Sequence, residues 1–140
     1  LGVETGRRAP LRNVRETVLR LRAGKGMVLD AEDPDTCSVG SFFTNPFVEV
    51  VPEGAPGWAQ PDGRIKTSAA WLIENAGVHK GFRLPGAQVA VSSKHTLALT
   101  NRGGGTTAQL LDLAREIRSR VEGRFGITLE PEPVLWGCSL

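Results

Sequence analysis

The strongest structural signal in the sequence is a helical pattern between the pair Thr106–Thr107 and Gly126. Either threonine can cap a helix by accepting a backbone N–H bond, and glycine commonly follows the last helical residue. The apolar residues recur at the three-to-four-residue spacing of one helix face. They are Leu110, Leu111, Ala114, Ile117 and Val121. Charged residues occupy the opposite face, so the pattern predicts a long amphipathic helix with one solvated side.

Two shorter helices are predicted earlier in the chain. Residues 10–23 place apolar side chains at helical spacing before Gly24, which indicates an amphipathic helix that ends there. Ser68 is a favourable N-cap for a short helix that continues to Asn75, and Gly77 follows as a stop.

Short apolar runs predict the strands, because each has about the length of a paired strand and is bounded by turn residues. The runs are 47–51, 88–91, 97–101, 127–129 and 134–136. Residues 30–36 and 52–63 are rich in aspartate, proline or glycine, which is typical of turns and loops. The pattern indicates an α+β fold, with a small sheet of short strands packed against two to three helices in one domain, residues 1–140.

The composition excludes several classes of function. Hydrophobic residues make up 40% and charged residues 23% of the chain, as in ordinary globular domains. The 17 Lys and Arg nearly balance the 15 Asp and Glu and form no basic run, so neither nucleic acid nor a membrane surface is predicted as a partner. Cys37 and Cys138 form no C-x-x-C pair, so no zinc site or disulfide framework is predicted. A reducing cytoplasm is the expected location.

The first candidate site is GSFFTNP, residues 40–46, in which Ser41 and Asn45 flank a phenylalanine pair and proline fixes the exit. A strand end followed by a turn would explain this run without any function. A hydrolase triad of Ser41, His95 and an acid is disfavoured, because no G-x-S-x-G motif surrounds the serine.

The second candidate is RGGGTT, residues 102–107, because exposed N–H groups before a helix attract anions. The run lacks the Lys-Ser/Thr end of a P-loop and does not match G-x-G-x-x-G, so a flexible turn leading to an N-cap is favoured. The two histidines, His79 and His95, have no carboxylate or cysteine at ligand spacing, and no metal site is predicted.

Taken in order, several motifs resemble the C-terminal part of the UDP-N-acetylenolpyruvoylglucosamine reductase family. They are KGMVLD, GSFFTNP, AAWLIENAGVHKGFRLPGAQVAVSSKH, ALTN and FGITLEPE, and the similarity spans roughly residues 1–137. The resemblance implies a flavoenzyme that uses FAD and NADPH to convert UDP-N-acetylglucosamine enolpyruvate to UDP-N-acetylmuramate for peptidoglycan. A stand-alone module that binds a nucleotide sugar or phosphate, without redox activity, is the alternative.

The resemblance also assigns roles to individual residues. Ser41 is expected to be the general acid that protonates the substrate carbon, and Glu132, the second glutamate of LEPE, to complete the catalytic set. Four further residues are expected to bind the substrate, the first two through its diphosphate. They are Lys25, Asn45, Lys80 and His95.

The family carries FAD on N-terminal domains, and no part of this sequence resembles them. No position matches the catalytic arginine of the family either. The resemblance therefore implies that FAD-binding domains belong to the same polypeptide outside this chain. A final strand, about residues 127–137, is expected to pack against them.

Overall fold

The computed structural model describes residues 2–140. Its helices and strands, in chain order, are α1 (Leu11–Ala23), β1 (Ser38–Ser41), β2 (Phe47–Val48), β3 (Gly57–Ala59), β4 (Ile65–Thr67), α2 (Ala69–Asn75), β5 (Val89–Val91), β6 (Ala98–Asn101) and α3 (Thr107–Phe125). Short strands mixed with helices confirm the predicted α+β fold.

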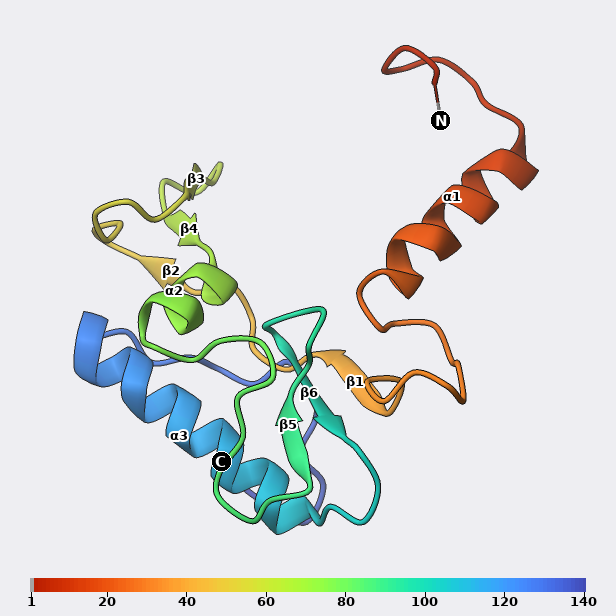
Figure 1. The fold of residues 1–140 in the computed structure, drawn as a ribbon. Coiled ribbons are helices and arrows are strands. Elements are labelled where there is room, and N and C mark those ends of the chain that lie inside the picture. The colour runs from red at the N-terminus through yellow and green to blue at the C-terminus, as the bar shows by residue number, and fades with distance from the viewer. Residues whose placement is uncertain (1) are drawn as a thin grey trace.

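The strands form two small antiparallel sheets rather than one (Figure 1). The first has the order β1-β6-β5 and the second the order β2-β4-β3. Strand β1 ends at Ser41 in the first sheet, and β2 begins at Phe47 in the second. The motif GSFFTNP therefore crosses from one sheet to the other, and its residues lie at the junction between the two.

Helix α3 packs against α2, β5 and β6 and supplies much of the core (Figure 1). It begins with a capping box, in which the Thr106 hydroxyl accepts from the Gln109 N–H while the Gln109 side chain accepts from the Thr106 N–H. It ends at Gly126, whose N–H bonds the carbonyl of Glu122. Of the predicted apolar stripe only Leu110 stays partly exposed, and the structure adds Leu113, which is fully buried.

Phe42 and Phe43 are the largest side chains of the core, each about 1% exposed. Their rings meet edge to face with centroids 5.0 Å apart, a geometry that aromatic quadrupoles favour. The Phe42 N–H donates to the carbonyl of Leu97 at 2.7 Å. The two phenylalanines thus anchor residues 40–46, which we call the crossing segment, in the core.

Helix α1 forms as predicted but lies apart from the rest of the chain (Figure 1). Its residues are all described, and none of them is buried. It contacts no other helix or strand of residues 2–140. Within this range, none of the helices combines the length and apolar character that crossing a bilayer requires.

Three predictions of local structure need correction. The run 47–51 is a strand only at Phe47–Val48, and the loop 52–63 contains β3. Residues 127–137, all described, form no strand beyond a single antiparallel bridge between Phe43 and Pro131. Pro131 and Pro133 lack the N–H groups that a ladder needs, which explains why the pairing stops at one bridge. Val134 and Trp136 are left 89% and 94% exposed.

The capping box gives a direct test of how α3 is held. Thr106→Ala removes the hydroxyl acceptor and should lower the free energy of unfolding by about 1 kcal/mol. The matched control is Thr107→Ala at the first helical residue, which is exposed and should change stability little. Urea denaturation of both variants measures the difference, and equal effects would contradict the capping assignment.

Candidate functional site

A bulge in β1 sets the direction of the Ser41 side chain. Ser38 pairs with Thr100 and Ser41 with Ala98, so three steps on β1 match two on β6. Gly40 takes up the extra residue with φ +83°, a conformation that residues with a side chain rarely adopt. A one-residue slip turns following side chains to the other face of a strand. The bulge therefore decides which face carries Ser41.

Beyond the bulge, the segment that crosses between the sheets lines one pocket of about 320 Å³. Ser41, Phe43 and Asn45 are among the lining residues. Phe43 is buried, so it forms an apolar wall behind the two polar side chains. The pocket is completed by Thr44, Lys66, Leu97 and Glu132.

The Asn45 carboxamide is fixed by the start of α2. Its Oδ1 accepts the Ala69 N–H at 2.9 Å, which satisfies one of the first helical N–H groups. Because the oxygen is used in this way, the side-chain NH₂ is the group left to donate toward the pocket. The backbone position of Asn45 follows from Pro46, whose carbonyl accepts the Thr67 N–H at 3.0 Å.

Glu132 reaches the pocket through pairing of the chain end with the crossing segment. The Thr44 N–H donates to Glu130 at 3.0 Å, and the Glu132 N–H donates to Phe42 at 2.8 Å. These two bonds flank the Phe43–Pro131 bridge. The motif LEPE is therefore held beside GSFFTNP although about 90 residues separate them.

Lys66 is a charged residue of the pocket that the sequence prediction did not include. It lies in β4 opposite Phe47, and its ammonium is 5.2 Å from the centre of that ring. Its neighbour Thr67 is buried, so alternation along the strand turns Lys66 toward the open face. The run IKT between the glycine-rich loop and the Ser68 cap was the available signal, but it is too short to show a strand period.

His95 lies on the other side of Ser41. Its Nε2 is 3.4 Å from the Ser41 Oγ, and the imidazole is half-buried. Burial lowers the pKa of His95, and the nearby ammonium groups of Lys25 and Lys80 lower it further, while Glu74 opposes them. The ring is therefore neutral at pH 7.

A buried carboxylate, Asp35, holds the turn that carries His95. Its Oδ2 accepts from the hydroxyls of Ser92 and Ser93 at 2.9 and 2.7 Å and from the Ser93 N–H at 2.7 Å. Its Oδ1 accepts from Arg102 at 2.7 Å. Burial raises the pKa of Asp35, but the serine bonds and the Arg102 charge outweigh it and leave the pKa below its usual value. The Ser92 hydroxyl in turn accepts the backbone N–H of His95 at 3.2 Å.

Residues 33–136 match the protein family described as UDP-N-acetylenolpyruvoylglucosamine reductase, C-terminal domain. The chain belongs to this family. The resemblance inferred from the sequence motifs is therefore confirmed.

Curated relatives that carry the name UDP-N-acetylenolpyruvoylglucosamine reductase are similar along the whole chain. The relative from Cutibacterium acnes is 57% identical over 143 residues, which are 38% of its length. The relative from Salinispora arenicola is 55% identical over 152 residues, or 42% of its length, and that from Mycobacterium marinum 54% over 150 residues, or 41%. The chain thus spans about two-fifths of the length of these relatives.

The structure brings the family-derived site residues into one neighbourhood. Ser41, Asn45 and Glu132 share a pocket, and His95 contacts Ser41. Lys25 and Lys80 are exposed, and both lie near enough to His95 to lower its pKa. Their roles in binding and catalysis remain predictions.

The run RGGGTT is a turn in which the N–H groups of Gly103 and Gly105 already have an acceptor in the same chain. The Asn101 Oδ1 accepts from Gly103 and Gly105 at 3.1 and 3.0 Å, and the Asn101 NH₂ donates to Gly105. Arg102 bonds Asp35. The Asn101 side chain therefore takes two of the N–H groups that a phosphate would need, which supports the turn interpretation.

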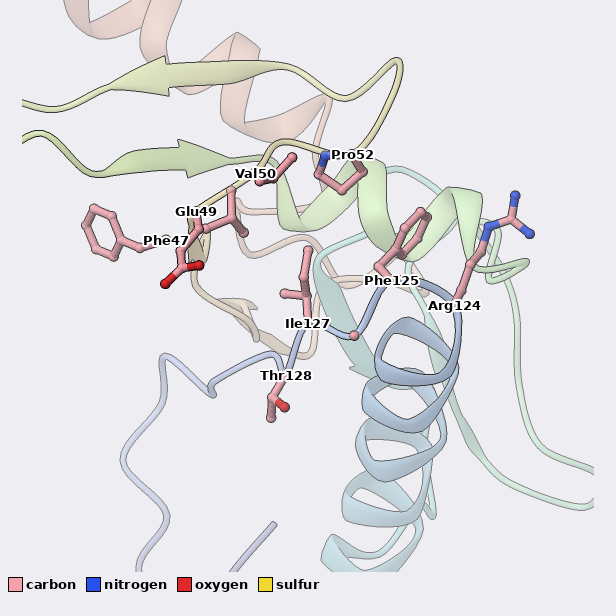
Figure 2. Close-up of a pocket in the computed structure, with 10 residues that line it drawn as sticks. Phe47, Glu49, Val50, Pro52, Arg124, Phe125, Ile127 and Thr128 are labelled. Carbon is pink, nitrogen blue, oxygen red and sulfur yellow. The ribbon is translucent and has the colours of Figure 1, made fainter.

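A larger pocket, about 660 Å³, lies away from these residues (Figure 2). Its walls come from residues 47–52 and from the end of α3 with the residues after it. Val50, Pro52, Phe125 and Ile127 give it an apolar middle, and the Arg124 guanidinium points away from Glu49 (Figure 2). No pair of groups there is placed for proton transfer, so the smaller pocket is the candidate site.

The Asp35 cluster should make stability depend on acid pH. Asp35→Asn removes the charge that its donors bind and should lower the free energy of unfolding at pH 7 by about 1.5–3 kcal/mol. Because the folded pKa of Asp35 lies below its unfolded value, its contribution is complete above about pH 4 and is lost as the pH falls further. The gap between wild type and variant, measured by urea denaturation, should therefore shrink in acid.

Asp62→Asn is the matched control for this experiment. Asp62 also bonds an arginine, Arg64, at 2.9 Å, but both side chains are at least half exposed. Exposed pairs add little to stability, so the control should behave like wild type at every pH. A gap for Asp35→Asn that stays constant down to pH 2 would contradict the assignment of an ionised Asp35.

Proposed function

We propose that the chain is the substrate-binding and proton-donating part of a reductase that converts UDP-N-acetylglucosamine enolpyruvate to UDP-N-acetylmuramate with FAD and NADPH. The observation that carries the proposal is the pocket at the junction of the two sheets, where Ser41, Asn45 and Glu132 meet. Family membership supports the substrate class. A cytoplasmic location stays a prediction from the sequence.

We propose that the redox cofactor is held largely outside the residues described. Both sheets are small and antiparallel, and in the glycine-rich turn the N–H groups of Gly103 and Gly105 are bonded to Asn101. Dinucleotide sites of the glycine-rich type need such N–H groups for a pyrophosphate. This supports our proposal that FAD is bound by a part of the polypeptide outside this chain.

The charges around the pocket suit a dianionic diphosphate. Lys66 lines the pocket, and Lys25 and Lys80 lie on its His95 side. An ammonium acts as a mobile point charge for phosphate, and the Asn45 NH₂ can add a directional hydrogen bond. In this proposal, the lysines attract the substrate, and Asn45, which is held by the start of α2, fixes the position of the diphosphate.

The proton transfer falls to Ser41 in this proposal. Reduction of the enolpyruvyl double bond leaves one carbon that must take a proton, and a positioned donor accelerates that step. A hydroxyl is a weak acid, so its low acidity has to be offset by a precise position and orientation relative to the substrate carbon. The Gly40 bulge and the buried phenylalanine pair hold the Ser41 backbone rigidly. Glu132 faces the same pocket, and in this proposal it stabilises the negative charge that develops on the substrate through a protonated or bridged carboxyl group.

Ser41→Ala tests the proposed donor in the protein encoded by the complete reading frame. Turnover should fall roughly 10²–10⁴-fold while KM stays close to wild type, because only the transition state loses an interaction. Ser41→Cys keeps a transferable proton and should retain more activity. Ser119→Ala, an exposed serine on α3, is the control. Turnover of Ser41→Ala at the wild-type rate would exclude the role.

Lys66→Ala tests the proposed diphosphate contact, and Lys25→Ala tests the same role on the other side. Each should raise KM roughly tenfold and change kcat little, since the diphosphate is bound equally in the ground and transition states. Arg64→Ala is the matched control, because Arg64 also stacks on Phe47, at 3.9 Å, without lining the pocket. Steady-state kinetics on a UDP-sugar enolpyruvate separates the three. If Arg64→Ala raised KM as much as Lys66→Ala does, the effect would come from the general positive charge of this surface rather than from a direct contact between Lys66 and the diphosphate.

A further inference from the structure

We propose that His95 is a positioning residue for the proton donor, which donates its Nε2–H to the Ser41 oxygen and thereby directs the Ser41 hydroxyl proton into the pocket. The family resemblance suggested only a substrate contact for His95. This inference rests on the proposed function, because it concerns how Ser41 performs the proton transfer described above.

The geometry restricts what the two groups can do for each other. The Ser41 Oγ and His95 Nε2 are 3.4 Å apart, and Ser41 lines the pocket. Catalytic hydrogen bonds are often long before substrate is bound and tighten in the complex. If Ser41 donated to the ring, its only proton would point at His95 and away from the substrate. Donation by the ring leaves the hydroxyl proton for the pocket.

The backbone that carries the ring is held in place. The Ser92 hydroxyl accepts the backbone N–H of His95 at 3.2 Å and is itself bonded to the buried Asp35. The following residue, Thr96, is buried and its hydroxyl bonds Glu74 of α2. The His95 backbone is thus fixed on both sides, which keeps the imidazole beside Ser41.

The charges that face His95 suit a neutral donor. They are Lys25 after α1, Glu74 on α2 and Lys80 in the turn before β5. Together with burial, the two ammonium groups keep the pKa of the ring low, so at pH 7 it carries one N–H. Protonation at lower pH leaves the Nε2–H in place, so acid should not abolish this bond.

The step balances without a further reactant. The Ser41 O–H bond breaks as a C–H bond forms on the substrate, and the electron pair stays on the Ser41 oxygen. The His95 N–H stabilises that charge, as an oxyanion donor does, and solvent returns the proton after product leaves. His95 itself neither gains nor loses a proton in the cycle.

The test compares His95→Leu with His95→Gln in the protein encoded by the complete reading frame. Leucine removes the donor and should lower kcat about 10²-fold with KM nearly unchanged. Glutamine can donate through its side-chain NH₂ and should recover kcat to within about tenfold of wild type. His79→Leu, at the exposed second histidine, is the matched control and should match wild type. Calorimetric titration with the UDP-sugar should show equal affinity in all four proteins.

The other outcomes each overturn the inference. Equal losses of kcat in His95→Leu and His95→Gln would indicate that the imidazole acts as a base. Weaker UDP-sugar binding with unchanged kcat would make it a substrate contact. A wild-type protein that binds the UDP-sugar but reduces no enolpyruvyl substrate would overturn the proposed function as well, whereas normal wild-type turnover with an active leucine variant would overturn only the role of His95.

Discussion

The buried carboxylate of Asp35 is the interaction on which the arrangement around the site depends. One side chain joins the turn at residues 33–36 to the turn at residues 92–95 and to the loop before α3, by four hydrogen bonds. An ionised group is costly to bury unless each lone pair has a donor, and here the donors converge from both loops. The neighbouring Asp33 is slightly less buried and also binds a cation, with 2.7 Å between its Oδ2 and the Lys94 Nζ. The turns are thus fixed by charge rather than by apolar packing.

The same carboxylate also limits the position of the KGM segment. A side chain at Gly26, which has φ +68°, would approach the Asp35 Cβ to 3.2 Å. The backbone beside Lys25 therefore packs directly over the cluster, and only glycine allows that approach. Lys25 precedes Gly26, which packs over Asp35, and the backbone of His95 bonds Ser92, which bonds Asp35, so segments about 70 residues apart meet around one carboxylate.

The sequence predicts those features that depend on local chemistry. The cap in the pair Thr106–Thr107, the Ser68 cap and the apolar stripe of the last helix are predicted correctly, because caps and helical spacing act within a few residues. Pairing partners depend on distant residues, so the separation into two sheets is not predictable from runs of two to four residues. Residues 127–137 form no strand within residues 2–140, because Pro131 and Pro133 cannot donate to a ladder. The packing of this segment against FAD-binding domains stays a prediction.

The candidate site shows the same difference between features set by local sequence and features set by distant residues. Family motifs indicate Ser41, Asn45 and Glu132, but the residues that set their geometry carry no such signal. Lys66 lies in a three-residue strand, and Asp35 lies in a run that predicts only a turn. The aspartates of such a turn normally face water and accept hydrogen bonds from backbone N–H groups of the same turn. Here two of its carboxylates are buried, because serines and cations from loops some 60 residues away provide the donors. The chemistry of the pocket thus depends on a long-range polar network, which forms only when the whole α+β fold is complete.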